Sequence, residues 1–300
     1  MDWSGYIKDF ESFLKLEKSL SPNSIEAYLG DIGKLVQHLE YRNIDLPPGK
    51  IELSHLENFL EWVAGLGMGA RSQARLLSGV KAFFKYLLFA DEIQSDPTAL
   101  LEAPRIGRKL PEVLSIDEID RLIAALDLSK PEGHRNKAML ETLYSCGLRV
   151  SELTGLRMTN LFFDQGFIRI LGKGNKERLV PISGKAIKEI STYLNGYRNK
   201  LDVKKDSENI VFLNRRGRKL TRVMVFTIIK DLAKEIGLKK KISPHTFRHS
   251  FATHLIDGGA DLRAVQEMLG HESITTTEIY THLDREYLRD SIIQYHPRSK

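Results

Sequence analysis

The sequence predicts a mainly helical protein of two domains, the second of which also contains a small antiparallel β-sheet. Apolar residues recur at helical spacing through the first 100 residues, whereas short runs between residues 167 and 213 are typical of strands. A chain of 300 residues is long enough for two hydrophobic cores. We therefore expect a helical N-terminal domain at residues 1–103, a linker at 104–112 and a mixed α+β domain at 113–300.

The N-terminal domain contains clear helix signals. Ser21 followed by Pro22 is typical of an N-cap and a first helical position. Ser54 and Glu57 have the spacing of a capping box, which predicts a second helix that ends at the glycines of 65–69. The first and third predicted helices carry apolar stripes at Ile25, Tyr28, Leu29, Ile32, Leu35, Val36, Leu39, Leu76, Val80, Phe83, Phe84 and Leu87.

The second domain restarts with another capping box, at Ser115 and Glu118. A following helix is expected to end at Gly147, which places Arg149 at the start of the next short helix. Three strands are predicted next, at 167–171, 178–182 and 209–213, with a Gly- and Lys-rich turn between the first two.

Two more helices follow the predicted strands. Ser243 and Pro244 open one of them, so His245 and Arg248 stand on one helical face. Asp261 caps another helix, which is closed by Gly270.

Six side chains of the second domain supply what is needed to break a phosphodiester without a metal ion. A tyrosine with a pKa of about 10 costs roughly 4 kcal/mol to ionise at neutral pH, unless cations or a base assist. Arginine grips two phosphate oxygens at once, lysine can protonate a departing oxygen, and histidine can move protons. The six residues are Arg149, Lys173, His245, Arg248, His271 and Tyr280.

The segments around these residues resemble the catalytic boxes of the tyrosine recombinase (integrase) family, in that family's order. They are SCGLRVSEL around Arg149, GKGNKERLVP around Lys173, SPHTFRHSFATHL around Arg248, GADLRAVQEMLGH ending at His271, and TTTEIYTHL around Tyr280. The N-terminal stretches SPNSIEAYLGDI and ARLLSGVKAFFKYL, with DPTALLEAPRIGRKLPEVLS after them, resemble the XerD branch of the Xer recombinases.

The resemblance implies a site-specific recombinase that closes as a two-domain clamp on double-stranded DNA and acts at a dif-like site to resolve chromosome dimers. It implies Tyr280 as the nucleophile, the two arginines as a phosphate clamp, Lys173 as general acid, His245 as an acid/base group and His271 as a hydrogen-bond donor. It further implies no cofactor, metal or ATP. The implied protein partners are a second Xer-type recombinase or further copies of this chain, in a tetramer on two DNA sites, and a DNA translocase of the FtsK type.

Each residue also has a structural interpretation. Arg149 could simply pair with Glu152, and His245 with His249 has the spacing of zinc ligands on a helix. The GKGNK turn lacks the spacing of a nucleotide-binding loop. At the level of function, the alternatives are a type IB topoisomerase, which rejoins its own strand, and a DNA-binding regulator without catalysis.

Charge distribution favours an anionic partner for the second domain. The whole chain has a formal charge of +6. Up to residue 108 there are 12 Lys and Arg against 15 Asp and Glu, whereas the remainder has 33 against 24. The positive potential therefore lies with the six candidate residues, as binding to a polyanion requires. Basic residues also border the third predicted helix and the linker, where they could follow a phosphate backbone, at Arg71, Arg75, Lys81, Lys85, Arg105, Arg108 and Lys109.

The remaining features predict a cytoplasmic protein. Cys146 is the single cysteine, which excludes an internal disulfide and fits a reducing compartment. The N-terminus has no apolar leader, and no stretch approaches 18 apolar residues. The short apolar stripe of Leu288, Ile292 and Ile293 must dock either on its own domain, the default for a terminal helix, or on a neighbouring protomer, which the family resemblance implies.

Overall fold

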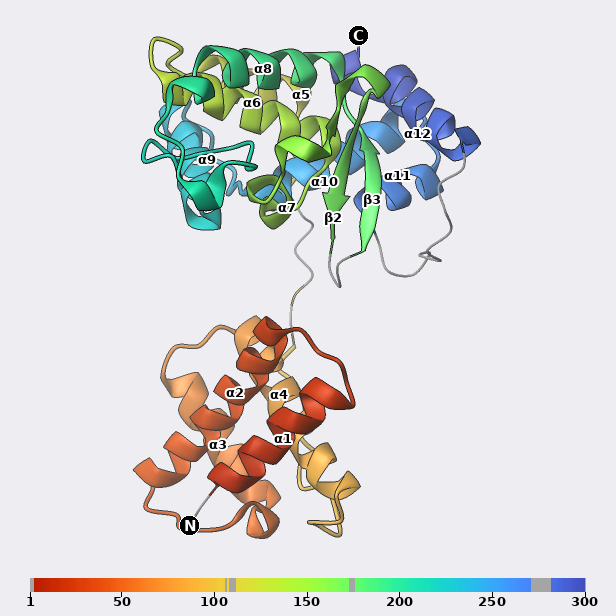
Figure 1. Cartoon of the computed structure of the whole chain (residues 1–300). Coiled ribbons are helices and arrows are strands. Elements are labelled where there is room, and N and C mark those ends of the chain that lie inside the picture. The colour runs from red at the N-terminus through yellow and green to blue at the C-terminus, as the bar shows by residue number, and fades with distance from the viewer. Residues whose placement is uncertain (1–2, 106, 108–111, 173–175, 271–281, 300) are drawn as a thin grey trace. The chain divides into compact units, whose positions relative to one another are not determined.

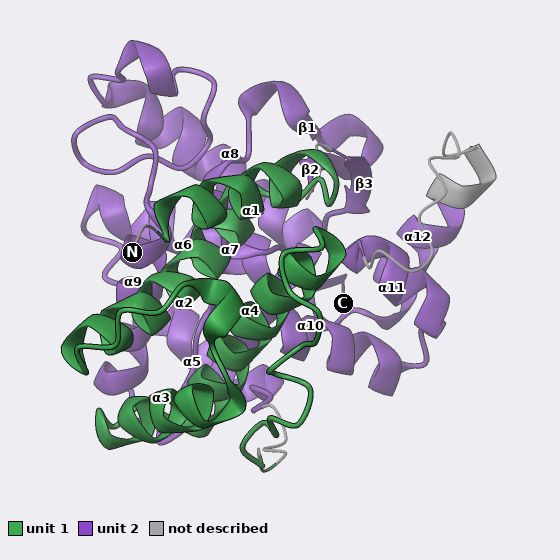
Figure 2. Cartoon of the chain, turned by 90° about the horizontal axis from the view of Figure 1, so that it is seen from below, with its two compact units in different colours: residues 1–109 green, residues 110–300 purple. Residues whose placement is uncertain are grey.

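The computed structural model describes residues 3–105, 107, 112–172, 176–270 and 282–299. For residues 282–285 it describes the backbone alone. The chain forms two compact units, residues 1–109 and 110–300 (Figures 1 and 2). Each unit has its own hydrophobic core. No helix within the described ranges is long and apolar enough to cross a membrane.

All regular elements in the described part of unit 1 are helices, joined by loops. Its elements are α1 (Ser4–Leu16), α2 (Pro22–Tyr41), the 3-10 turn η1 (Pro48–Lys50), α3 (Leu53–Gly65) and α4 (Ala70–Phe89). The predicted N-cap is confirmed, because the Ser21 side chain accepts a hydrogen bond from the backbone N–H of Ser24. The predicted capping box of the next helix is wrong: α3 begins two residues earlier than expected, with Glu52 instead of Ser54 as its N-cap and His55 completing the box.

Two of the four basic residues on the edge of α4, Arg75 and Lys81, bind partners within unit 1. Arg75 makes a two-pronged ion pair with the buried Asp31 of α2, with both N···O distances at 2.8 Å. The Lys81 ammonium donates to the carbonyl of Leu101 at 2.7 Å. These two side chains therefore help to hold unit 1 together.

Unit 2 combines α-helices with a small sheet (Figure 1). The α-helices are α5 (Ile116–Ala124), α6 (Pro131–Cys146), α7 (Val150–Thr154), α8 (Gly184–Gly196), α9 (Arg222–Glu235), α10 (Pro244–Gly258), α11 (Leu262–Leu269) and α12 (His282–Tyr295). The 3-10 turns are η2 (Met158–Asn160), η3 (Phe163–Gln165), η5 (Arg198–Lys200), η6 (Lys205–Ser207) and η8 (Pro297–Ser299). Helix α6 is buried along most of its length and packs against α8 and α10, so it forms the centre of the core.

The sheet is antiparallel, as predicted, but one of its strands differs. Its order is β1 (Leu161–Phe162), β2 (Phe167–Leu171) and β3 (Glu177–Pro181). The predicted strand at 209–213 is wrong, because only isolated bridges form there, from Ile210 to Arg157 and from Leu213 to Lys219. Val211, Phe212 and Leu213 are nevertheless buried, which explains their apolar character.

The C-terminal helix α12 packs on its own unit. Leu288 and Ile292 are buried, whereas Ile293 is 52% exposed. Figure 1 shows α12 beside α11 and the sheet, and it contacts α10, α11 and β3. In this structure Leu288 and Ile292 are covered by their own domain, which is one of the two alternatives for the stripe.

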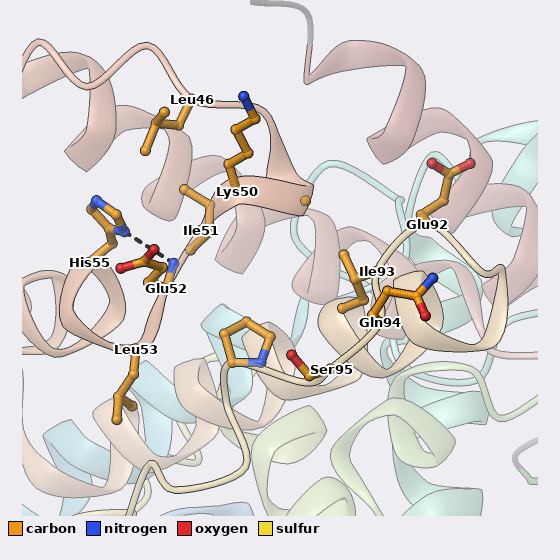
Figure 3. Close-up of a pocket in the computed structure, with 12 residues that line it drawn as sticks. Leu46, Lys50, Ile51, Glu52, Leu53, His55, Glu92, Ile93, Gln94 and Ser95 are labelled. Carbon is orange, nitrogen blue, oxygen red and sulfur yellow. Dashed lines mark hydrogen bonds between the residues drawn. The ribbon is translucent and has the colours of Figure 1, made fainter.

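Unit 1 also has a hollow of about 720 Å³ between the segments around Ile51 and Ile93 (Figure 3). Its wall mixes apolar, acidic and basic side chains, and its described lining residues all belong to unit 1.

Candidate active site

Arg149 is positioned by the turn between α6 and α7. Helix α6 ends at Cys146, and Gly147 follows with a φ of 57°, in the left-handed region that favours glycine. This turn lets the chain restart as α7 with Arg149 at the N-cap, as predicted. A Cβ atom on Gly147 would lie only 2.4 Å from a ring carbon of Phe251. The same glycine thus permits the close approach of α6 and α10.

One buried carboxylate, that of Glu152, organises the charges of the site. It accepts the backbone N–H of Arg149 at 2.8 Å, Arg149 Nη1 at 2.9 Å, and Arg178 Nη1 and Nη2 at 2.8 and 2.9 Å. Burial alone would raise the pKa of Glu152, but the hydrogen bonds and charge of Arg178, followed by the hydrogen bonds from Arg149, outweigh burial and hold that pKa below its ordinary value. Glu152 is therefore ionised at neutral pH.

Arg248 lies beside this carboxylate and is held mainly by backbone carbonyls. It donates to the carbonyl of Gly147 at 2.8 Å and to that of Leu269 at 2.6 Å. Its Nη1 is 4.0 Å from Glu152 Oε2. Burial, with the nearby Arg149 charge, lowers the pKa of the Arg248 guanidinium to about 10, so it remains charged at neutral pH.

The cluster has more positive than negative charge. Arg149, Arg178 and Arg248 contribute three positive charges and Glu152 one negative charge, which leaves a surplus of two. Arg149 is the most accessible of the three guanidiniums, with 36% of its side chain exposed. A guanidinium cluster with surplus positive charge and one accessible member is suited to bind an anion with several oxygens, such as a phosphodiester.

His245 stands close to Arg248 along the same helix. The two residues are three apart on α10, so they share a face. Both line a groove of about 580 Å³, which also has an apolar wall from α10 and α11. The apolar wall is formed by Ala252, Ile256, Leu262, Val265 and Leu269. The structure thus brings Arg149 and Arg248 together at Glu152, and it places His245 beside Arg248 on the groove.

Lys173, His271 and Tyr280 lie outside the described residues, so their positions and roles remain predictions. The chain on either side of Lys173 is described. Leu171 of β2 is paired with Glu177 of β3, and the N–H of Gly172 donates to the carbonyl of Lys176 at 2.8 Å. The residue before His271 is Gly270, whose carbonyl accepts from Arg149 Nη2 at 3.2 Å. Two of the three residues therefore follow directly on segments near the arginine cluster.

Sequence reasoning missed the part that Glu152 and Arg178 play. Glu152 follows Arg149 at the spacing of a capping box, which could have indicated its importance. No local pattern connects Arg178 to Glu152, because the two are 26 residues apart. Arg178 is buried, and besides Glu152 its Nε binds the carbonyl of Met268 at 2.9 Å.

Gly147→Ala should destabilise the protein strongly. The new methyl group would occupy the space of the Phe251 ring and would force a left-handed conformation on alanine. We expect a loss of about 2–4 kcal/mol in the free energy of unfolding, measured by denaturant titration. Gly184→Ala is the control, because a Cβ there meets nothing within 4 Å. Equal stability of the two variants would contradict this account of the turn.

Comparison with known proteins identifies the family. Residues 112–286 match the model of the phage integrase family, and residues 7–90 match the phage integrase N-terminal SAM-like domain. The chain is 43% identical over 293 residues to a tyrosine recombinase XerD of Listeria monocytogenes serotype 4b (strain F2365), covering 98% of this chain and 99% of the relative. The chain therefore belongs to the phage integrase family and is a site-specific tyrosine recombinase.

Further relatives place it more narrowly. Tyrosine recombinase XerD of Staphylococcus haemolyticus (strain JCSC1435) is 40% identical over 296 residues, with 98% and 99% coverage. A crystal structure of XerH bound to a palindromic difH substrate is 25% identical, covers 96% of this chain and 84% of that one, and has a TM-score of 0.70. The resemblance to the XerD branch, the mainly helical fold class and the recombinase function are confirmed.

Proposed function

We propose that this recombinase cuts and rejoins DNA by attack of the Tyr280 hydroxyl on a phosphodiester. The P–O5′ bond breaks, a 3′-phosphotyrosine forms, and the free 5′ hydroxyl then attacks the partner strand's phosphotyrosine. The observation that carries the proposal is the surplus of two positive charges in the cluster of Arg149, Arg178, Arg248 and Glu152. Such a site can hold the scissile phosphate before and during the attack.

The proposed division of labour follows from the chemistry of each group. Arg149 and Arg248 stabilise the negative charge that grows on the phosphate, and each preorganised donor is worth about 3–4 kcal/mol. Lys173 protonates the departing 5′ oxygen, because a lysine side chain is long and carries an ammonium group that can give up a proton. In the sequence it comes two residues after Leu171, the last residue of β2. His245 exchanges a proton near Arg248, and His271 donates to the phosphate.

This mechanism needs neither a metal ion nor ATP. The fixed guanidiniums provide the positive charge that a divalent ion would otherwise supply. Each phosphodiester that is broken is replaced by another ester bond of similar energy, so no external energy source is needed.

The names of the relatives support a role in the resolution of chromosome dimers. We assign this chain to the resolution of chromosome dimers at a dif-like site in the cytoplasm, because its curated relatives are XerD proteins and a structural neighbour binds difH. Unit 1 then serves as the helical DNA-binding domain of a clamp on double-stranded DNA. The protein partners are a second Xer-type recombinase or further copies of this chain, in a tetramer on two sites, with a translocase of the FtsK type as a further partner. Similarity to recombinases disfavours the topoisomerase and the regulator.

The test is a covalent trapping experiment. Wild-type protein is incubated with a nicked dif-like duplex in excess chelator, and protein-bound DNA that survives denaturation is measured. We expect the adduct to form at a rate within about twofold of that without chelator, because the cations of the site are side chains. Loss of the adduct in chelator, restored by zinc or magnesium, would refute the metal-free mechanism.

A further inference from the structure

Arg178 joins three parts of the catalytic unit through one side chain. It stands on β3, its two terminal nitrogens bind both oxygens of Glu152 on α7, and its Nε binds the carbonyl of Met268 near the end of α11. Only 7% of its side chain is exposed. Arg178 is therefore positioned to act through its neighbours, with little surface left to contact DNA.

The contacts at the end of α11 are equally close. Gly270 has a φ of 66°, and a Cβ there would lie 3.1–3.3 Å from Arg178 Cδ, Nε and Cζ. The carbonyls of Leu269 and Gly270 accept hydrogen bonds from Arg248 and Arg149. The guanidinium of Arg178 thus supports the same turn that holds both clamp arginines.

The charge of Arg178 matters as much as its shape. Glu152 needs a counter-ion, and Arg178 supplies one with a two-pronged, buried pair. If Arg178 were absent, the Arg149 guanidinium could close on both carboxylate oxygens, and the surplus charge of the cluster would fall from two to one. Fewer N–H groups of Arg149 would then be directed at a phosphate.

We propose that Arg178 is a positioning residue, which neutralises Glu152 and fixes the end of α11 so that Arg149 and Arg248 keep their charge and N–H groups for the scissile phosphate. This inference rests on the proposed function. It predicts that the need for Arg178 depends on the negative charge of the phosphate itself.

The test compares two nicked substrates in the trapping experiment. One carries an ordinary scissile phosphate, and the other carries a methylphosphonate, in which a neutral methyl group replaces one charged oxygen. For Arg178→Ala we expect adduct formation to fall about 100-fold on the phosphate but less than about tenfold on the methylphosphonate, because displaced catalytic groups cost about that much where their charge is needed. Arg178→Lys keeps the charge without the fork, so it should lie between Arg178→Ala and wild type.

The ratio of the two rates within one variant makes the result independent of folding. A variant that is merely less stable loses active protein, so both rates fall by one factor and the ratio stays at its wild-type value. Arg169→Ala is the control, because Arg169 lies in the same hairpin on the neighbouring strand and pairs with Glu177 outside the cluster. An unchanged ratio in Arg178→Ala would overturn the proposal, as would a changed ratio in Arg169→Ala. Failure of the wild-type chain to form any adduct would instead refute the proposed function.

Discussion

Tyr280→Phe should abolish the covalent adduct and leave DNA affinity within about twofold of wild type. Phenylalanine keeps the ring but lacks the attacking oxygen, and removal of a catalytic nucleophile lowers a rate by about 10⁴-fold or more. Binding should persist, since phosphate contacts of basic residues dominate affinity for DNA and one hydroxyl contributes about 1 kcal/mol at most. The two measurements are the trapped adduct on a nicked site and the dissociation constant on an intact one.

Tyr287→Phe is the matched control for this prediction. Tyr287 lies seven residues later on α12 and is 46% exposed, so it is an accessible tyrosine of the same C-terminal region. We expect its substitution to leave the adduct unchanged. If the adduct persisted in Tyr280→Phe and disappeared in Tyr287→Phe, the nucleophile would have to be reassigned.

Local signals in the sequence predicted the elements that position Arg149 and Arg248. The end of α6 at Gly147 follows from the left-handed turn that glycine permits, and the caps at Ser115 and Asp261 follow from side chains that accept nearby backbone N–H groups. These interactions span a few residues, so a sequence pattern contains them. Local competition still decides details, since Glu52 and His55 cap α3 in place of Ser54.

The wrong strand at 209–213 shows where local patterns are insufficient. Val211, Phe212 and Leu213 are fully buried, and a short buried apolar run looks the same whether or not it joins a sheet. Its backbone groups bond to separate segments: Val211 N–H donates to the carbonyl of Leu156, and the carbonyl of Phe212 accepts from Leu220 N–H. Because these partners are scattered, no ladder forms.

The candidate site also has a part that the sequence predicts and a part that depends on packing between distant segments. The residue types that can bind and cleave a phosphodiester were visible in the sequence, because their chemistry belongs to each side chain. The connection from Arg178 through Glu152 to Arg149 and Arg248 was not visible, since it depends on how β3, α7 and α10 pack. A side chain that acts through another gives no signal of its own in a single sequence.

The C-terminal segment is tied to its own unit, because His296 and Arg298 near its described end are buried in unit 2. Arg298 donates from Nε to Glu141 Oε2 at 2.9 Å and from Nη1 to Asp120 Oδ1 at 2.5 Å, and it lies over the ring of Tyr144. His296 is also buried and contacts the carbonyl of Tyr144 at 3.3 Å. Burial lowers the pKa of His296 to about 3, so it is neutral at physiological pH and adds no charge beside Arg298.

Arg298→Ala should therefore destabilise the catalytic unit itself. Its side chain is 5% exposed and that of Glu141 is fully buried. Among the described residues, the substitution leaves this buried carboxylate with the half-exposed Lys185 as its one charged partner. Breaking a buried pair in this way costs about 3–5 kcal/mol, and Lys185 should keep the loss near the lower figure. Denaturant unfolding of the full chain measures it, with Arg289→Ala, an exposed arginine of α12, as the control.

A second substitution separates the ion pair from the packing around it. In Arg298→Ala combined with Glu141→Gln, no uncompensated charge remains buried, so we expect part of the lost stability to return. If the tail instead served a neighbouring protomer, Arg298→Ala would leave the unfolding free energy of the monomer unchanged and would weaken only cooperative binding to paired DNA sites. That outcome would reverse the assignment of α12 and the last residues to their own domain.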